Sequence, residues 1–456
     1  MSDNDSNTLE GAAPEANPAS SHRHLGLIDA SAIVISGCIG IGIFFSPATV
    51  LARAGSAGWA LVAWGLGGLI AIVGGLCFAE LGALRPRTGG QYRVLREAWG
   101  SGVGVAYAGT TGLIINSGSL AVLAAYATDF LCQAFGWKLT GADWTIVSLS
   151  WLAALAIVNW MGIRRAADLM DVLTLGKLIT IAALGASAVL LSTRGEPAHA
   201  VSPFRFGAAP SAQGFLYALL PVLFATGGWQ QVLWTAGDIK HPSRNIPRSL
   251  LIGITSVILA YFTVNAACLW LLGPERASAS ETVASDAMTV AWAGAGRWFA
   301  GAIGLSALGT AHVILMTASR EQAAFGQTGD GPRWLSSIDP KSGAARRSVL
   351  ALTCWSSLLL VIAGRDGINS LLDAVVMADF VFLGLGALSV LVLRKRHPNE
   401  ARPFRCPGGA VLPLTFGSVA VLVASSPWFV PTLRPWAAAV SIVVIGLLII
   451  GNRRAR

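Results

Sequence analysis

Long apolar stretches alternate with short polar, Arg-rich segments along most of this chain. Most of these stretches approach the roughly 20 residues that an α-helix needs to cross a bilayer. We therefore predict twelve membrane-spanning helices, over residues 25–52, 59–84, 102–135, 144–163, 169–192, 213–236, 250–272, 297–325, 349–363, 368–393, 411–427 and 436–451. The pattern predicts an all-α polytopic membrane protein.

Composition agrees with this pattern. Hydrophobic residues make up 54% of the 456 positions and charged residues only 12%, and the mean hydropathy is +0.63. A soluble domain carries about twice that share of charge. Residues 1–22 are polar and lack the apolar core of a signal peptide, so we expect a disordered cytoplasmic tail there. A single transmembrane domain over 23–451 and a short cytoplasmic tail over 452–456 would follow.

Basic residues test the number of spans independently of hydropathy. With a cytoplasmic N-terminus, 23 of the 32 Lys and Arg residues fall in inner segments and eight in outer ones, while Lys177 falls within a span. This distribution follows the positive-inside rule and favours a bacterial-type inner membrane with both termini in the cytoplasm. Anionic lipid headgroups then account for the net charge of +9, and we expect no nucleic-acid partner.

Groups that could carry enzyme chemistry are sparse. The six cysteines are scattered without metal-ligand spacing, which predicts neither a disulfide framework nor a metal site. The candidates that stand out within the predicted spans, Lys177, His312 and Asp379, are isolated from one another. A membrane enzyme would need converging nucleophiles, acid/base pairs or metal ligands. We predict a protein that is not an enzyme and has no cofactor.

Two predicted spans are interrupted by small residues. The first contains Ser36–Gly42 (SGCIGIG), where unwinding would expose backbone N–H groups suited to a carboxylate at the start of the second half-helix. In the sixth, Pro221 precedes Phe224–Trp229 (FATGGW), where a break would leave carbonyls free for an ammonium group. These glycines could equally be close-packing contacts between helices.

The position of the two breaks, half a chain apart, points to inverted repeats. The first repeat would cover about 25–192 and the second about 213–395, with two extra helices over about 411–451.

Several segments resemble the amino acid–polyamine–organocation superfamily, and most closely its L-type amino acid transporter branch. Residues 39–44 (IGIGIF) are similar to the first-span signature of that family, 85–92 (RPRTGGQY) to its loop after span two, and 224–248 to its sixth span and following loop. The resemblance covers about residues 25–410. It implies the LeuT-type fold, in which two five-helix repeats are inverted and helices one and six are broken.

The resemblance also implies a function. It predicts a secondary active transporter that exchanges free L-amino acids by alternating access without sodium. Proton-coupled symport is the alternative, and a transporter-like amino acid sensor is a more distant one. Eukaryotic members bind an ancillary glycoprotein through a cysteine in the outer loop after span three. Because Cys132 lies within the predicted span instead, we expect no obligate disulfide-linked subunit.

In the family, the first break holds the substrate carboxylate on backbone N–H groups, which here belong to Gly40, Ile41 and Gly42. The carbonyls of Cys38 and Phe224 would face the α-ammonium group, and the Phe224 ring would be the outer gate. Ile41 departs from the Ser or Thr that the family often has, which removes a hydroxyl contact. The predicted substrate-binding residues are Cys38, Ile39, Gly40, Ile41, Gly42, Phe224, Ala225, Thr226, Gly227, Gly228 and Asp379.

Charged and aromatic residues within the spans supply the remaining candidates. Lys177 resembles the fifth-span lysine that replaces sodium in sodium-independent members, although it could instead snorkel to the interface. Asp379 is predicted to recognise a substrate side chain or relay a proton, with a neutral packing role as the alternative. Trp229 could be a gate or a packing residue. His312 could reach the cavity, although packing is the more common role of a lone histidine, and Asp373 is expected to be solvated or capping.

Overall fold

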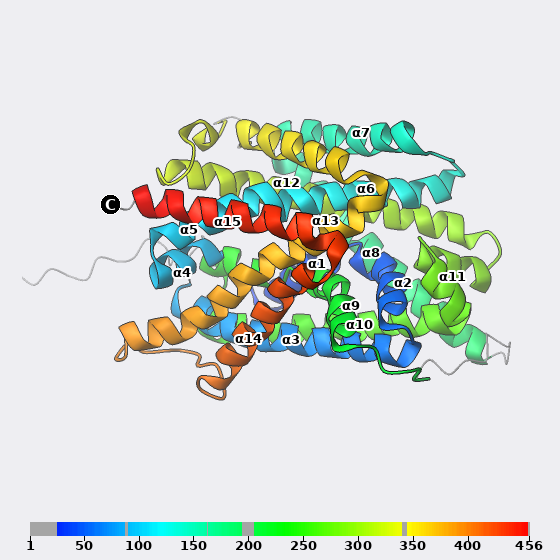
Figure 1. The fold of residues 1–456 in the computed structure, drawn as a ribbon, viewed down its shortest axis with the longest axis horizontal. Coiled ribbons are helices and arrows are strands. Elements are labelled where there is room, and N and C mark those ends of the chain that lie inside the picture. Colours follow the sequence, from blue (N-terminus) through cyan, green and yellow to red (C-terminus); the bar gives the residue numbers. More distant parts are fainter. Residues whose placement is uncertain (1–24, 87–89, 162, 194–204, 340–343, 455–456) are drawn as a thin grey trace, which may run out of the picture.

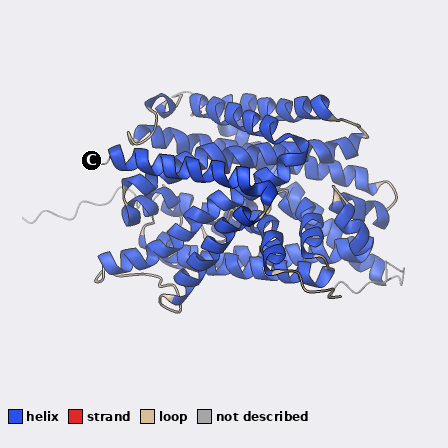
Figure 2. Cartoon of the chain, in the orientation of Figure 1, coloured by secondary structure: helices blue, strands red, loops and turns tan. Residues whose placement is uncertain are grey.

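The computed structural model describes residues 25–86, 90–161, 163–193, 205–339 and 344–454. The predicted N-terminal tail lies outside these residues. The described residues form helices and connecting turns, with no strand among them (Figure 2). Several long helices, among them α3 (Ala57–Leu84), α6 (Asn116–Phe135) and α12 (Ala295–Gln327), run along the longest axis of the molecule (Figure 1).

The prediction of a polytopic all-α membrane protein is confirmed. Eight described helices are long and apolar enough to cross a membrane, and the pair α1 (Leu27–Cys38) and α2 (Gly42–Ala54), bent by 48°, adds a ninth span. The 51-residue α13 (Arg346–Arg396) contains both predicted spans nine and ten. A kink at Gly364, which has a φ of 59°, divides it into the two spans. The fifth and sixth predicted spans correspond to α8 (Ile163–Thr193) and to α9 (Ala212–Thr226) with the 3-10 helix η3 (Trp229–Asp238).

The remaining helices complete the bundle around these elements. They are α4 (Gly90–Trp99), α5 (Ser101–Thr110), the π-helix η2 (Thr111–Ile115), α7 (Gly141–Trp160), α10 (Pro242–Ala279), α11 (Val283–Ala291), η4 (Arg333–Ser336), α14 (Val411–Ser425), η5 (Ser426–Phe429), η6 (Pro431–Leu433) and α15 (Arg434–Arg454).

Glycines let α3 approach its neighbour α10 closely. A Cβ atom on Gly68 would lie 2.7 Å from Cγ1 of Ile258, and one on Gly75 would lie 2.6 Å from Cδ1 of Ile254. Between helices in lipid, close van der Waals contact replaces the hydrophobic effect as the main source of association. The glycine-rich surface of α3 thereby fixes α10, which in turn packs against both α1 and α2.

A cluster of basic side chains forms ion pairs at one end of the bundle. The buried carboxylate of Glu80 accepts hydrogen bonds from Nε of Arg394 at 2.9 Å and from Nη1 of Arg402 at 3.2 Å. At the same end, Arg85 bonds Glu400 and lowers the pKa of that carboxyl group. Helix α4 and the C-terminal end of α15 also lie at this end (Figure 1).

An ion pair inside the opposite half of the bundle joins three helices. Arg53 on α2 donates to both carboxylate oxygens of Asp373 on α13, at 3.0 Å each. It also donates at 3.1 Å to the carbonyl of Tyr217, which has no helical donor because Pro221 lacks an N–H group. The expectation that Asp373 is solvated or capping is wrong. Its side chain is fully buried, because Arg53 compensates the charge.

We expect Asp373→Asn to lower the free energy of unfolding by about 3–5 kcal/mol, because the Arg53 guanidinium would stay buried without its counter-charge. Thermal unfolding of the purified protein in detergent measures this loss as a fall in melting temperature. Asp366→Asn, an exposed change on the same helix, is the control. Equal melting temperatures for the two variants would contradict a stabilising role of the pair.

Candidate functional site

The first helix break lies between α1 and α2. Helix α1 ends at Cys38 and α2 begins at Gly42, so Ile39–Ile41 form a non-helical link. Within the link, the N–H group of Gly40 donates to the carbonyl of Cys38 at 2.8 Å. The first N–H groups of α2 have no acceptor inside the helix, and they carry the positive end of its dipole. This geometry favours an anionic group such as a carboxylate.

The second break lies between α9 and η3. Helix α9 ends at Thr226 and η3 begins at Trp229, with Gly227 and Gly228 between them. Gly228 has a φ of 100°, in the left-handed region that favours glycine. The N–H group of Gly227 donates to the carbonyl of Phe224 at 3.3 Å. The last carbonyls of α9 carry the negative end of its helix dipole, which favours an ammonium group.

The two breaks pack directly on each other. A Cβ atom on Gly42 would lie 2.9 Å from Cα of Ala225, and one on Gly228 would collide with the carbonyl oxygen of Gly37. Both interpretations of these glycines therefore apply together. They interrupt the helices, and they let the unwound segments approach.

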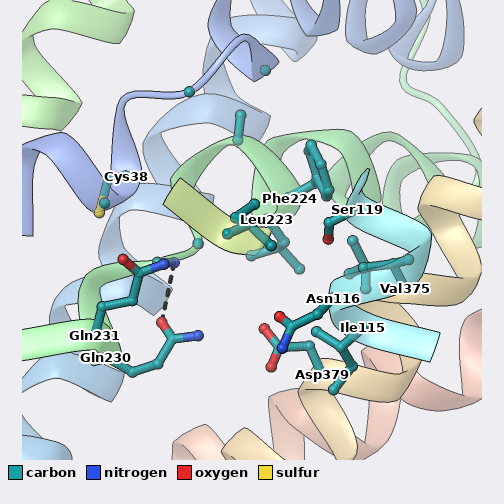
Figure 3. A pocket seen from close by; sticks show the side chains of 18 of the residues that line it. Cys38, Ile115, Asn116, Ser119, Leu223, Phe224, Gln230, Gln231, Val375 and Asp379 are labelled. Carbon is teal, nitrogen blue, oxygen red and sulfur yellow. Dashed lines mark hydrogen bonds between the residues drawn. The ribbon is translucent and has the colours of Figure 1, made fainter. Parts of the chain in front are cut away.

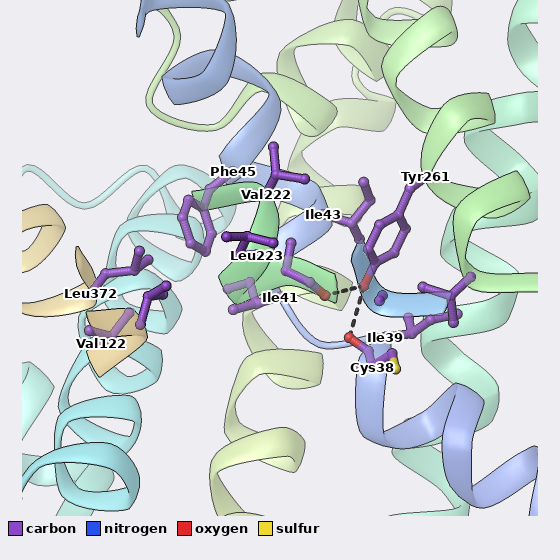
Figure 4. Packing of buried hydrophobic residues seen from close by; sticks show 14 of the residues in the cluster. Cys38, Ile39, Ile41, Ile43, Phe45, Val122, Val222, Leu223, Tyr261 and Leu372 are labelled. Carbon is purple, nitrogen blue, oxygen red and sulfur yellow. Dashed lines mark hydrogen bonds between the residues drawn. The ribbon is translucent and has the colours of Figure 1, made fainter. Parts of the chain in front are cut away.

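A tyrosine that the sequence did not single out holds the breaks in register. The hydroxyl group of Tyr261 on α10 lies 2.8 Å from the carbonyl oxygen of Cys38 and 2.8 Å from that of Ala225 (Figure 4). Since a hydroxyl has one proton, the two carbonyls share it. Tyr261 is buried, and a buried tyrosine in an apolar span normally has a partner for its hydroxyl. From the sequence, this rule could have indicated that the Tyr261 hydroxyl group has a hydrogen-bond partner, but not which group that partner is.

A cavity of about 130 Å³ opens beside the two breaks (Figure 3). Its volume is about ten times what one water molecule needs. Nine of the eleven predicted substrate-binding residues line it, namely Cys38, Gly40, Ile41, Gly42, Phe224, Ala225, Gly227, Gly228 and Asp379. Ile39 and Thr226 do not, and the Thr226 hydroxyl instead donates to the carbonyl of Val222 at 2.9 Å.

Polar side chains line the part of the cavity away from the breaks. Asp379 lies there beside Asn116 (Figure 3), and its carboxylate forms no ion pair or hydrogen bond with another described residue. Nδ2 of Asn116 is buried and has no hydrogen-bond partner among the described residues. The unpaired carboxyl group of Asp379 makes this end suitable for a polar or cationic ligand group.

Sequence reasoning did not anticipate most of the wall formed by α5, η2 and α6. Tyr107, Thr111 and Ser119 line the cavity from these elements. The π-helix η2 interrupts the α-helical geometry between α5 and α6, and such short π-segments often occur at functional sites. The recurrence of Thr, Asn and Ser in an apolar span was the available signal.

Three rings separate the cavity from the end of the bundle opposite the Glu80–Arg394 ion pair. Phe45 stacks on Tyr126 with 3.7 Å between ring centroids, and its centroid lies 6.4 Å from that of Phe224. The hydroxyl group of Tyr126 donates to Oδ1 of Asn369 on α13 at 2.8 Å. The predicted gate residue Phe224 is therefore one part of an aromatic partition that α13 holds in place.

Of the three other candidates, two do not line the cavity and the third has a side chain outside the described residues. Trp229 packs edge-on against Phe78 on α3, with 5.2 Å between centroids, and does not line the cavity. Nδ1 of His312 is buried 3.0 Å from Nδ2 of Asn159, which fits its packing role. The side chain of Lys177 lies outside the described residues. In the described part of the chain, no group of three or more His, Cys, Asp or Glu residues could hold a metal ion.

Two broken helices around a mid-bundle cavity define a helical membrane transporter of the broken-helix class. The profile of the amino acid permease family matches residues 25–451, so the chain belongs to that family. It is 29% identical to the human "large neutral amino acids transporter small subunit 2" over 417 residues, which cover 86% of this chain and 75% of the relative.

Two further relatives carry amino acid transporter names. The human "b(0,+)-type amino acid transporter 1" is 26% identical over 444 residues, covering 95% of this chain and 88% of the relative. The mouse "Asc-type amino acid transporter 1" is 29% identical over 392 residues, covering 84% and 72%. The resemblance to the L-type branch, stated from the motifs, is thereby confirmed.

Proposed function

We propose that this protein exchanges amino acids across a bacterial-type inner membrane by alternating access, without sodium. One observation carries the proposal: the N-terminus of α2 and the C-terminus of α9, which have opposite dipole ends, meet at one cavity. An amino acid has a carboxylate and an ammonium group on one carbon, and the two helix ends suit these groups. The family and the transporter names of the relatives support the same conclusion.

Transport would proceed by moving the broken helices relative to the rest of the bundle. The aromatic partition of Phe45, Tyr126 and Phe224 would close the outer side, and the cytoplasmic half of α1 would control the inner side. There, the N–H group of Lys240 donates to the carbonyl of Leu25 at 2.8 Å, which ties the beginning of α1 to the segment after η3. Breaking this tie would free the cytoplasmic half of α1.

Counterflow in proteoliposomes tests the proposal. Vesicles loaded with one unlabelled amino acid should accumulate the same labelled amino acid from outside, and unloaded vesicles should not. Replacing sodium by choline should leave the rate unchanged, since Lys177 is proposed to supply the charge that sodium supplies in other transporters. Collapse of uptake in choline would overturn sodium independence, and uptake that does not depend on internal amino acid would overturn exchange.

Proton-coupled symport is a second candidate function, and the unpaired carboxyl group of Asp379 in the cavity favours it. If Asp379 carries the coupled proton, Asp379→Asn should flatten the pH dependence of uptake for every substrate. If Asp379 instead recognises a substrate side chain, the variant should weaken cationic substrates selectively and leave the pH profile unchanged. Uptake of cationic, polar and apolar amino acids over a pH series separates the two. If the variant has an unaltered substrate preference and an unaltered pH dependence of uptake, Asp379 is only a packing residue.

We further propose that no disulfide-linked subunit is needed. The name of one relative describes it as a small subunit. Here Cys132 lies in α6 and is half-buried. A reducible heterodimer on a gel would overturn this part of the proposal.

A further inference from the structure

A second and larger cavity, of about 370 Å³, lies at the end of the bundle opposite the basic cluster. We call it the outer vestibule. Its walls come from α2, α6, the turn between α10 and α11, and the kinked part of α13, and they include Asp129, Glu281, Arg365, Asp366 and Asn369. Its volume is nearly three times that of the cavity at the helix breaks.

The floor of the outer vestibule is the aromatic partition itself. Phe45 and Tyr126 line the vestibule, whereas Phe224 lines the cavity at the breaks. Because Phe45 contacts both other rings, a solute in the vestibule is separated from the inner cavity by this one layer. The vestibule therefore stands on the path that a substrate from outside would take.

Acidic side chains outnumber basic ones in the lining of the outer vestibule. Among the described residues, Arg365 is the only basic one in its lining, and its Nη2 atom lies 3.2 Å from Asp129 and 2.9 Å from Glu281. Asp366 is exposed, lines the same space, and has no ion pair among the described residues. With all four groups ionised, the lining carries two negative charges in excess. The low-dielectric protein that surrounds a cleft concentrates such a field within it.

This set of charges matches a zwitterion. The two ion pairs of Arg365 involve its Nη2 atom, so Nη1 and Nε of the exposed guanidinium group can still bind a carboxylate, and the excess of carboxylates attracts an ammonium group. An additional positive charge on the solute would strengthen the attraction, and an additional negative charge would oppose it.

We propose that the outer vestibule is a low-affinity binding site for amino acids arriving from outside, which favours cationic and neutral amino acids over anionic ones before the aromatic partition opens. The proposal rests on the proposed function and on the orientation that places the basic end in the cytoplasm. It concerns recognition on one side of the membrane only, which separates it from selection by Asp379 in the inner cavity.

The test uses competition against counterflow in proteoliposomes whose protein has one orientation. L-Lysine, L-alanine and L-glutamate are added as competitors, either outside or inside. In Asp366→Asn, the external inhibition constant of lysine should rise about threefold and that of glutamate fall about threefold, as expected for one unit charge a few ångströms away in a water-filled space. Alanine should change little, and about 1 M salt should remove both shifts.

Glu275→Gln is the matched control, because it removes the same charge from an exposed position at the same end of the bundle outside the vestibule. It should leave all three external constants unchanged. An unchanged ratio of lysine to glutamate in Asp366→Asn, an equal shift in Glu275→Gln, or an equal shift for internal competitors would overturn the proposal. Wild-type protein that exchanges no amino acid would refute the proposed function, and the vestibule proposal with it.

Discussion

Gly42→Val is expected to abolish amino acid binding and exchange. The first carbon of a side chain at this position would already lie 2.9 Å from Cα of Ala225 and 3.0 Å from its Cβ atom. Ala225 belongs to the second break, whose backbone Tyr261 holds, so it cannot yield as a flexible side chain would. The valine would also occupy the space beside the free N–H groups of α2. Both effects remove the carboxylate site.

Gly446→Val is the matched control for Gly42→Val. Gly446 is also helical, on α15, but a Cβ atom there would meet nothing within 4 Å. Each purified variant would be compared in monodispersity, melting temperature and counterflow rate. Gly42→Ala should show an intermediate loss. Normal substrate affinity in folded Gly42→Val would show that the carboxylate does not lie at the first break.

Tyr261→Phe is expected to lower the exchange rate by about tenfold to a hundredfold. Without the hydroxyl group, the buried carbonyl of Ala225 loses its donor and that of Cys38 keeps only the Gly40 N–H group. An unsatisfied buried group costs about 1–3 kcal/mol. The phenyl ring keeps the packing against Trp64, whose centroid lies 5.5 Å away. The loss should therefore fall on the register of the two breaks more than on the stability of the fold.

Tyr92→Phe is the control for Tyr261→Phe, because it also removes one hydroxyl hydrogen bond, to Asp330 at the basic end. It should retain nearly full counterflow. If Tyr261→Phe retains wild-type counterflow at wild-type substrate affinity, Tyr261 does not hold the site together.

Local sequence features were sufficient to predict the membrane-spanning helices and to mark the positions of the two possible breaks. Span length follows from apolar runs, and the breaks follow from Gly40, Gly42, Gly227 and Gly228, which weaken helices wherever they lie. Because both breaks form the wall of one cavity, most predicted site residues line it. Asp379 also lines this cavity, as its position in the middle of a predicted span suggested.

Contacts between distant residues could not be predicted in this way. Arg53 and Asp373 are 320 positions apart, so neither residue indicates that the other neutralises it. Tyr261 likewise bonds carbonyls on two other helices, and backbone acceptors leave no trace in the residue type. The packing of Trp229 against Phe78 and Phe416 depends on where η3 and α14 lie relative to α3, which hydropathy does not specify.

The most direct test of the central claim is an experimental structure of the protein in a lipid nanodisc with a bound amino acid, chosen as the one that gives the strongest counterflow. The expected result is density between the two breaks, with the carboxylate against the N–H groups that begin α2 and the ammonium group against the carbonyls that end α9. Density for the amino acid elsewhere, with the space between Gly42 and Phe224 filled by packed side chains, would contradict the proposed site.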